Sequence, residues 1–277
     1  MGHRAWPALC DLSGRGAGIM RALVTGAGAR LGQAMALYLG TRGYDVAVHY
    51  AGSAAGAAQT VAQLQDMGRN AVALQADLLD EQATQDLLPA AAKALGGPIT
   101  VLVNNASIFE YDTIKTASRD SWDRHLGSNL RAPFVLTQAL AAQAPQAVTD
   151  ENGEAMAQAL VINMLDQRVH KLTPEFMTYT IAKMGLWAFT QTAAQALSPH
   201  VRVNGIGPGP TLQGHRQSQV HFENQRAATI LQRGANPSDI TTALGFFLDS
   251  PAVTGQMVNV DGGQHLGWQT PDVLGVE

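Results

Sequence analysis

Three polar residues in one short segment have types and spacing that suit acid–base chemistry. Tyr179 and Lys183 stand four residues apart in a stretch predicted to be helical, so both side chains would lie on one helix face. An ammonium group beside a phenol stabilises the phenolate, so we expect Lys183 to lower the pKa of Tyr179 and tune it as a general acid/base. Asp166, thirteen residues before the tyrosine, adds a carboxylate, which only accepts hydrogen bonds while ionised.

A glycine-rich turn earlier in the chain is typical of a nucleotide site. The segment VTGAGARLG follows a predicted strand and opens a predicted helix, with glycine at positions 26, 28 and 32. Gly26, Gly28 and Gly32 allow a tight turn and close backbone approach, so a pyrophosphate can sit against the helix N-terminus. Arg30 can pair with a cofactor phosphate or with an anionic part of the substrate. The alternative for Arg30 is a solvated side chain on an exposed helix face.

The end of the second predicted strand indicates which nicotinamide cofactor is used. An NAD site usually places Asp or Glu here to accept hydrogen bonds from the ribose hydroxyls, but the sequence reads HYAGS. His49, Tyr50 and Ser53 are neutral or basic groups that tolerate a 2′-phosphate, so the sequence predicts NADP(H). The alternative is that His49 merely caps a strand.

Composition excludes several classes of protein. The chain has 277 residues, 46% of them hydrophobic, and a net charge of −4 without a basic stripe, so we expect a small-molecule substrate and no nucleic-acid partner. The one cysteine, Cys10, and the absence of clustered metal ligands predict a cytoplasmic, metal-free protein. No segment has the length of a membrane span. Residues 1–19 are interpreted as a flexible extension or the product of a misplaced start codon, with little function.

Short apolar runs alternate with longer helical segments, which predicts βαβ units. The expected fold is a single α/β Rossmann domain over residues 20–277, with a doubly wound, seven-stranded parallel sheet. The loop at about 211–236 follows a strand end and is interpreted either as a flap over the substrate or as a plain surface loop. The strands are predicted at 22–25, 45–49, 71–75, 100–104, 160–163, 202–206 and 257–260, and the helices at 31–40, 54–67, 81–95, 120–142, 179–197 and 238–248.

Seven ordered motifs resemble the short-chain dehydrogenase/reductase family from about residue 20 to residue 263. They are TGAGARLG, ADL at 76–78, NNAS at 104–107, Asn129 in SNLRAPF, YTIAK at 179–183, RVNGIGPGP at 202–210 and TGQMVNVDGG at 254–263. The resemblance implies that Lys183 holds the nicotinamide ribose and that Asn129 holds a water molecule in a proton relay. It implies cofactor contacts at Leu31, Asp77, Leu78, Asn105, Ala106, Ser107, Pro208, Gly209 and Thr211, and a homotetramer.

Asp166 is a departure from most of this family, which carries serine thirteen residues before the tyrosine. The sequence resembles the pteridine reductases and dihydromonapterin reductases, which carry aspartate at this position. Arg30, the HYxxS segment and NNASxF also resemble the motifs of that subgroup. That resemblance implies that Ser107 and Phe109 bind and stack the pterin ring, and that Arg30 reaches cofactor phosphate and ligand. Gly52 stands where these enzymes often carry an arginine for the 2′-phosphate.

The hydrogen-bonding groups of a pterin explain why an aspartate suits this position. A pterin presents several N–H donors, which an acidic acceptor can bind, whereas a carboxylate repels the oxyanion of a reduced ketone. The leading hypothesis is therefore NADPH-dependent reduction of a dihydropterin, dihydromonapterin or dihydrofolate, with protons relayed through Tyr179, Lys183 and Asp166. A reductase of ketones or 3-oxoacyl thioesters, with Asp166 incidental, is the alternative; a non-catalytic NADP-binding protein is the third.

Overall fold

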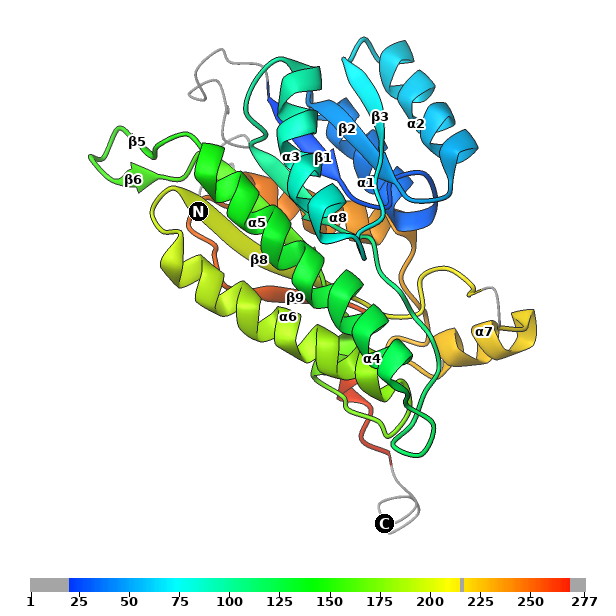
Figure 1. Cartoon of the computed structure of the whole chain (residues 1–277). Helices are drawn as coiled ribbons and strands as arrows, with labels where there is room; N and C mark the ends of the chain where they lie inside the picture. Colours follow the sequence, from blue (N-terminus) through cyan, green and yellow to red (C-terminus); the bar gives the residue numbers. More distant parts are fainter. Residues whose placement is uncertain (1–19, 215–216, 270–277) are drawn as a thin grey trace, which may run out of the picture.

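Seven parallel strands form one continuous sheet in the computed structural model, which describes residues 20–214 and 217–269 (Figure 1). The strand order is β3-β2-β1-β4-β7-β8-β9, so the direction of winding reverses between β1 and β4. This confirms the predicted Rossmann fold. The strands are β1 (Arg21–Val24), β2 (Asp45–Tyr50), β3 (Ala71–Gln75), β4 (Val101–Asn104), β7 (Ala159–Met164), β8 (Val201–Pro208) and β9 (Met257–Val260).

Helices cover both faces of the sheet, so that central strands such as β7 and β8 are almost entirely buried (Figure 1). One face packs against α1 (Arg30–Thr41), α2 (Ala54–Asp66) and α8 (Pro237–Asp249). The other packs against α3 (Glu81–Leu95), α5 (Ala132–Gln143) and α6 (Met177–Ala196). Parallel strands separated by right-handed crossovers bring all their carboxyl ends to one edge, where the functional residues must therefore gather.

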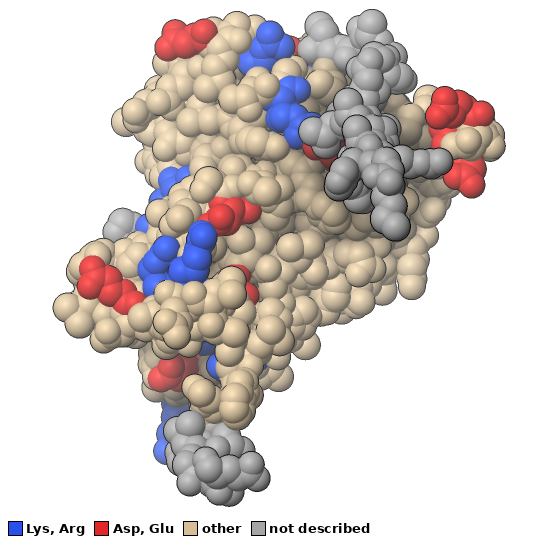
Figure 2. All heavy atoms as spheres, turned by 180° about the vertical axis from the view of Figure 1, so that it is seen from behind, with Lys and Arg blue, Asp and Glu red and all other residues tan. Residues whose placement is uncertain are grey.

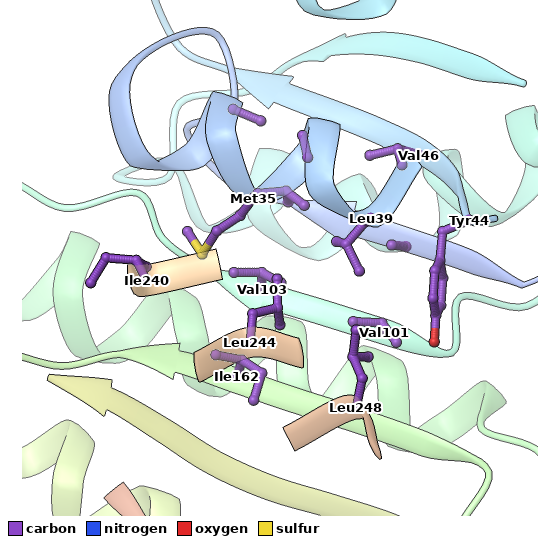
Figure 3. Close-up of a cluster of buried hydrophobic side chains, with 14 of the residues drawn as sticks. Met35, Leu39, Tyr44, Val46, Val101, Val103, Ile162, Ile240, Leu244 and Leu248 are labelled. Carbon is purple, nitrogen blue, oxygen red and sulfur yellow. The ribbon is translucent and has the colours of Figure 1, made fainter. Parts of the chain in front are cut away.

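The core on the α1/α8 face shows how this layer is held (Figure 3). Met35 and Leu39 of α1 and Leu244 of α8 point at Val103 and Ile162 of the central strands, and all five side chains are fully buried. These residues come from four elements far apart in the sequence. The sheet is thus fixed in place by apolar burial rather than by surface ion pairs, which are few and partly exposed among the described residues.

The helix predicted at 120–142 is interrupted. The structure has α4 (Arg119–Leu126), a π-helical turn (Gly127–Arg131) and then α5. Pro133 lies in the first turn of α5 and has no N–H to donate to the carbonyl of Asn129, four residues earlier, so a regular α-helix cannot continue through this point.

Two elements lie in stretches predicted to be irregular. The hairpin of β5 (Val148–Thr149) and β6 (Ala155–Met156) projects from the body, where the Asp150 side chain accepts hydrogen bonds from two turn N–H groups. α7 (Gln219–Ala227) occupies part of the predicted flap and is capped by Ser218. The predicted extension at 1–19 lies outside the described residues.

Charged side chains on the face seen in Figure 2 occur singly or in small groups, with both signs mixed over a largely uncharged surface. Within the described ranges, no helix combines the length and apolar character needed to cross a membrane.

We predict that Leu244→Ala lowers the free energy of unfolding by about 2–5 kcal/mol, because it removes a fully buried side chain between α8 and the sheet and leaves a cavity. Urea denaturation followed by circular dichroism measures the change. Leu231→Ala is the matched control, since Leu231 is 68% exposed. A loss at Leu244 no larger than that at Leu231 would contradict this account of the core.

Candidate active site

A cavity of about 570 Å³ opens at the carboxyl edge of the sheet, at the point where the strand order reverses. Its wall joins the glycine turn, the end of β4, the start of α6 and the segment after β8. Of the residues proposed from sequence, it brings together Gly26, Gly28, Arg30, Leu31, Gly32, Tyr50, Ser53, Asn105, Ala106, Ser107, Phe109, Asp166, Tyr179, Lys183, Pro208, Gly209 and Thr211. It leaves His49, Asp77, Leu78 and Asn129 outside the wall.

The glycine turn is built as a phosphate cradle. Gly26 has a φ of +64°, a conformation that favours glycine, and a Cβ on Gly32 would collide with the Gly26 carbonyl oxygen. The Thr25 hydroxyl accepts hydrogen bonds from the N–H groups of Asn105 (2.8 Å) and Ala106 (2.9 Å), which ties the end of β4 to the turn. No side chain caps the N-terminus of α1, so its N–H groups are open to an anion.

His49 does not line the cavity, which corrects the prediction that it binds the cofactor. Its side chain is 1% exposed, and its Nδ1 accepts a hydrogen bond from the N–H of Gly26 at 3.0 Å. Nε2 then carries the proton and donates to the carbonyl of Ala76 at 3.1 Å. Burial lowers the pKa of His49, so the neutral ring acts as an internal brace between the glycine turn, β2 and the end of β3.

The residues at and just after the end of β2 present uncharged groups to the cavity. Tyr50 and Ser53 line the wall, and no carboxylate of the described residues stands beside them there. Asp77 is exposed and its carboxylate accepts from the N–H of Leu79, while Leu78 packs in the core. The wall at this point can therefore accept a phosphorylated ribose without charge repulsion.

Arg30 joins the glycine turn to the predicted flap. Its guanidinium donates to the carbonyl oxygens of Gln213 (2.9 Å) and Leu212 (3.1 Å). The backbone φ of Arg30 is +54°, an unusual value for a residue with a side chain, so this conformation is held by its surroundings. Arg30 is neither free nor merely solvated: it fixes the segment that follows β8 across the mouth of the cavity.

The segment after β8 forms one side of the site. The Thr211 hydroxyl donates to the carbonyl of Gly209 at 3.0 Å, and a Cβ on Gly209 would press on Asp261. Phe222 and Gln225 of α7 also reach the cavity wall. The predicted flap thus contributes directly to the site, through a helix that was not predicted.

Asp166 and Tyr179 form the centre of the site. The phenolic O–H of Tyr179 donates to Oδ2 of Asp166 at 2.9 Å, and the other carboxylate oxygen accepts from the N–H of Arg168 at 2.8 Å. β7 carries Asp166 just past its carboxyl end, whereas Tyr179 lies in the first turn of α6. Two elements that pack side by side therefore hold the acid and the phenol in contact.

The pKa values of these groups are set mainly by burial. Burial raises the pKa of Asp166, in agreement with the expectation from sequence. The pKa of Tyr179 is raised well above its ordinary value by burial and then by the adjacent Asp166 charge, with a hydrogen bond from Ser107 acting in the opposite direction. This corrects the expectation that Lys183 lowers the pKa of Tyr179, because the carboxylate is the charge in direct contact with the phenol.

Lys183 lies in the cavity wall and is 2% exposed. Its ammonium group donates to the carbonyl of Met164 at 2.6 Å and lies 5.6 Å from the centre of the Tyr179 ring. Burial lowers its pKa to about 8, against the opposing effect of Asp166. The ammonium is thus anchored to the end of β7, with donors left for a hydroxyl group in the cavity.

Phe109 is a cavity-wall aromatic rather than a core residue, since it is 49% exposed. Its ring stacks on Phe176 at 4.3 Å between centroids, with an interplanar angle of 5°, and meets Tyr179 edge-on at 4.7 Å. Two neighbouring aromatic rings thereby hold the Phe109 ring in place. The exposed remainder faces the cavity beside the Asp166–Tyr179 pair.

Buried side chains anchor the segment around Phe109 at alternate residues. The amide of Asn129, in the π-helical turn, exchanges two 2.8 Å hydrogen bonds with the backbone of Ile108. Nε2 of His125 accepts from the N–H of Glu110 at 3.1 Å. Asn129 is therefore committed through its side chain to positioning Phe109, and its role in holding a water molecule stays a prediction.

The third anchor connects this segment to the catalytic helix. The Asp112 carboxylate accepts hydrogen bonds from the N–H and hydroxyl of Thr178, the residue before Tyr179, and from Ser121. Because Nε2 of His125 accepts a hydrogen bond, the ring is neutral, and its Nδ1 donates to the same Thr178 hydroxyl at 2.7 Å. Asp112, His125 and Thr178 are all at most 2% exposed. Phe109 and Tyr179 are consequently held by one buried polar network, which no sequence motif indicated.

Comparison with known proteins places the chain in a family. The family model for short chain dehydrogenases matches residues 20–224. The chain belongs to the short-chain dehydrogenase family. Its dehydrogenase/reductase relatives confirm that it is an oxidoreductase. Several similar solved structures contain NADP, in agreement with the predicted cofactor.

Among solved structures, this short-chain dehydrogenase is similar to FolM alternative dihydrofolate reductase 1 from Brucella canis, in a complex with NADP. The identity is 39% and the TM-score 0.84, over 92% of this chain and 97% of the Brucella chain. L-rhamnose 1-dehydrogenase from a Sphingomonas strain is 31% identical over 89% of this chain and 96% of its own. The 3-oxoacyl-[acyl-carrier-protein] reductase FabG of Staphylococcus epidermidis is 28% identical over 88% and 98%.

The buried histidines predict how stability depends on pH. Burial lowers the pKa of His49 and His125 below the ordinary 6.5, so the unfolded chain binds these protons at higher pH than the folded chain. The free energy of unfolding is then fully retained above about pH 6.5 and falls below it, by up to about 1.4 kcal/mol per pH unit for each histidine.

Denaturation at pH 7.5, 6.5 and 5.5 measures this slope. His49→Gln keeps a donor and an acceptor but cannot be protonated, and we expect it to flatten the slope, whereas His221→Gln, at an exposed position, leaves the slope as it is. An unchanged slope in His49→Gln would show that this ring is not the titrating group.

Proposed function

We propose that this short-chain dehydrogenase is an NADPH-dependent reductase of a pterin-type substrate: a dihydropterin, dihydromonapterin or dihydrofolate. The observation that carries the proposal is the partly buried contact between Tyr179 and Asp166 beside the exposed ring of Phe109. A carboxylate in this place suits a ring with N–H donors and disfavours a ketone whose oxygen becomes negative during reduction.

The cavity offers a matching group for each part of NADP(H). The uncapped α1 N-terminus and the glycine turn would hold the pyrophosphate, and Tyr50 and Ser53 would face the 2′-phosphate. Lys183 would hold the nicotinamide ribose, with Pro208, Gly209 and Thr211 along the nicotinamide. When bound, NADPH supplies the hydride.

Asp166 and Phe109 would orient the substrate ring. The carboxylate accepts N–H groups from the ring edge, while the exposed face of Phe109 provides an offset-stacking surface. Ser107, in the wall between them and the glycine turn, adds a hydroxyl that can donate or accept. The two aromatic contacts of Phe109 hold its ring in one orientation, so the platform is formed before substrate binds.

Asp166 and Tyr179 would deliver the proton to a ring nitrogen as the hydride reaches carbon. Burial raises the pKa of Asp166, so the protonated carboxyl group is more accessible here than in water. Its contact with the Tyr179 hydroxyl allows the proton to be passed between the two groups. Lys183, anchored on Met164, keeps a positive charge beneath the phenol.

The comparisons support this proposal and one alternative. The similar Brucella protein is named a dihydrofolate reductase, and its structure contains NADP. The FabG relative favours the second candidate, a reductase of 3-oxoacyl thioesters or ketones. A non-catalytic NADP-binding role has less support, because Tyr179, Lys183 and Asp166 all meet in the cavity. The homotetramer remains a prediction.

Replacing Asp166 separates the two candidate reactions. We predict that Asp166→Ser lowers kcat/KM for dihydropterins by about 100-fold or more, because it removes both the acceptor and the proton relay. Activity on ketones should survive or rise in this variant. NADPH oxidation followed at steady state measures both, and NADPH binding by fluorescence shows that the cofactor site is intact.

The wild-type protein provides the direct test. If it oxidises no NADPH with any oxidised or dihydro pterin, yet reduces ketones or acyl thioesters well, the pterin proposal is wrong and the alternative holds. Tight NADPH binding without turnover on either class would favour the non-catalytic reading.

A further inference from the structure

Arg168 is a cation in the cavity wall that the proposed reaction does not use. It lies in the 3₁₀ turn Gln167–Val169, which follows β7. It stands two residues after Asp166 and is half-buried. A partly buried guanidinium in a substrate cavity loses part of its hydration and gains from an anionic partner.

The guanidinium is held in place from two sides. Nη1 donates to the hydroxyl of Thr173 at 2.6 Å, and Cζ lies 4.9 Å from the centre of the Phe176 ring. Phe176 has a φ of +54°, an unfavourable value for a residue with a side chain, and it also stacks on Phe109. The surroundings hold Phe176 in this strained conformation, in which its ring connects Phe109 to the Arg168 guanidinium in one continuous row.

No carboxylate neutralises Arg168. Within the described part of the chain, no Asp or Glu oxygen lies within ion-pair distance of it, and of its five N–H donors one is engaged by Thr173. The other arginine in the wall, Arg30, has its guanidinium bonded to two loop carbonyl groups. Arg30 thus uses two of its five N–H donors to hold the loop, whereas Arg168 keeps four that can bind an anionic group of the substrate.

We propose that Arg168 binds a carboxylate on the substrate side chain, so that the substrate is a pterin with an acidic tail, of the dihydrofolate type, rather than one with a neutral side chain. Asp166 would take the N–H edge of the ring, Phe109 its face, and Arg168 the tail beyond Phe176. The opposite charges of Asp166 and Arg168 would fix the direction in which the substrate enters. This inference rests on the proposed pterin reduction.

The test compares dihydrofolate with dihydrobiopterin, whose side chain is uncharged, in the wild type, Arg168→Gln and Arg168→Lys. We expect Arg168→Gln to lower the ratio of kcat/KM for dihydrofolate over dihydrobiopterin by about tenfold or more, mainly through KM for dihydrofolate. Arg168→Lys keeps the charge and should restore part of the ratio. Arg119→Gln, which removes an arginine that is 87% exposed outside the cavity, should leave the ratio unchanged.

Two results would overturn the inference while leaving pterin reduction intact. One is an equal loss for both substrates, which would mean that Arg168 acts through Asp166 and Tyr179, on whose charges it exerts an electrostatic effect. The other is an unchanged ratio in Arg168→Gln. Failure of the wild type to reduce either pterin would overturn the proposed function together with this inference.

Discussion

The site depends on one contact, the hydrogen bond from Tyr179 to Asp166 between the end of β7 and the start of α6. Tyr179 is buried and Asp166 is partly buried, and a polar group that loses its water is stable only when it has a partner. Asp166 meets this demand with Tyr179 and the N–H of Arg168. The contact in turn requires α6 to sit in one register against the sheet, which the apolar packing of both helical layers provides.

The elements around that contact are held in position by buried polar side chains that take no part in the reaction. Asn129, His125 and Asp112 tie alternate residues of the segment after β4 to α4, the π-helical turn and α6. This leaves Phe109 directed at the cavity, next to Tyr179. His49 has a comparable structural role at the other end of the site, beneath the glycine turn. The site is thus a rigid arrangement held by buried polar side chains that do not themselves react.

Local patterns predicted most of the fold because strands buried on both faces read as short apolar runs. Every strand of the seven-stranded sheet lies within two residues of its predicted bounds. The helix at 120–142 was misjudged because the effect of Pro133 falls on a carbonyl four residues earlier, inside an apolar pattern that continues. Motifs also placed the glycine turn, Tyr179 and Asp166. They did not show that His49 faces inward or that Arg168 lines the cavity, because side-chain direction at a strand end depends on packing between distant segments.

The charges at the centre explain why an aspartate can replace a hydroxyl here. Burial disfavours both ions, so it raises the pKa of Asp166 and lowers that of Lys183 to about 8. Each shift brings the proton affinities of the acid and the base closer together, with the Tyr179 hydroxyl in contact with the acid. The free-energy difference between a proton on Lys183 and one on Asp166 is then smaller than in water, where the two pKa values lie far apart. A serine would donate a hydrogen bond but store no proton, which suits carbonyl oxygen better than ring nitrogen.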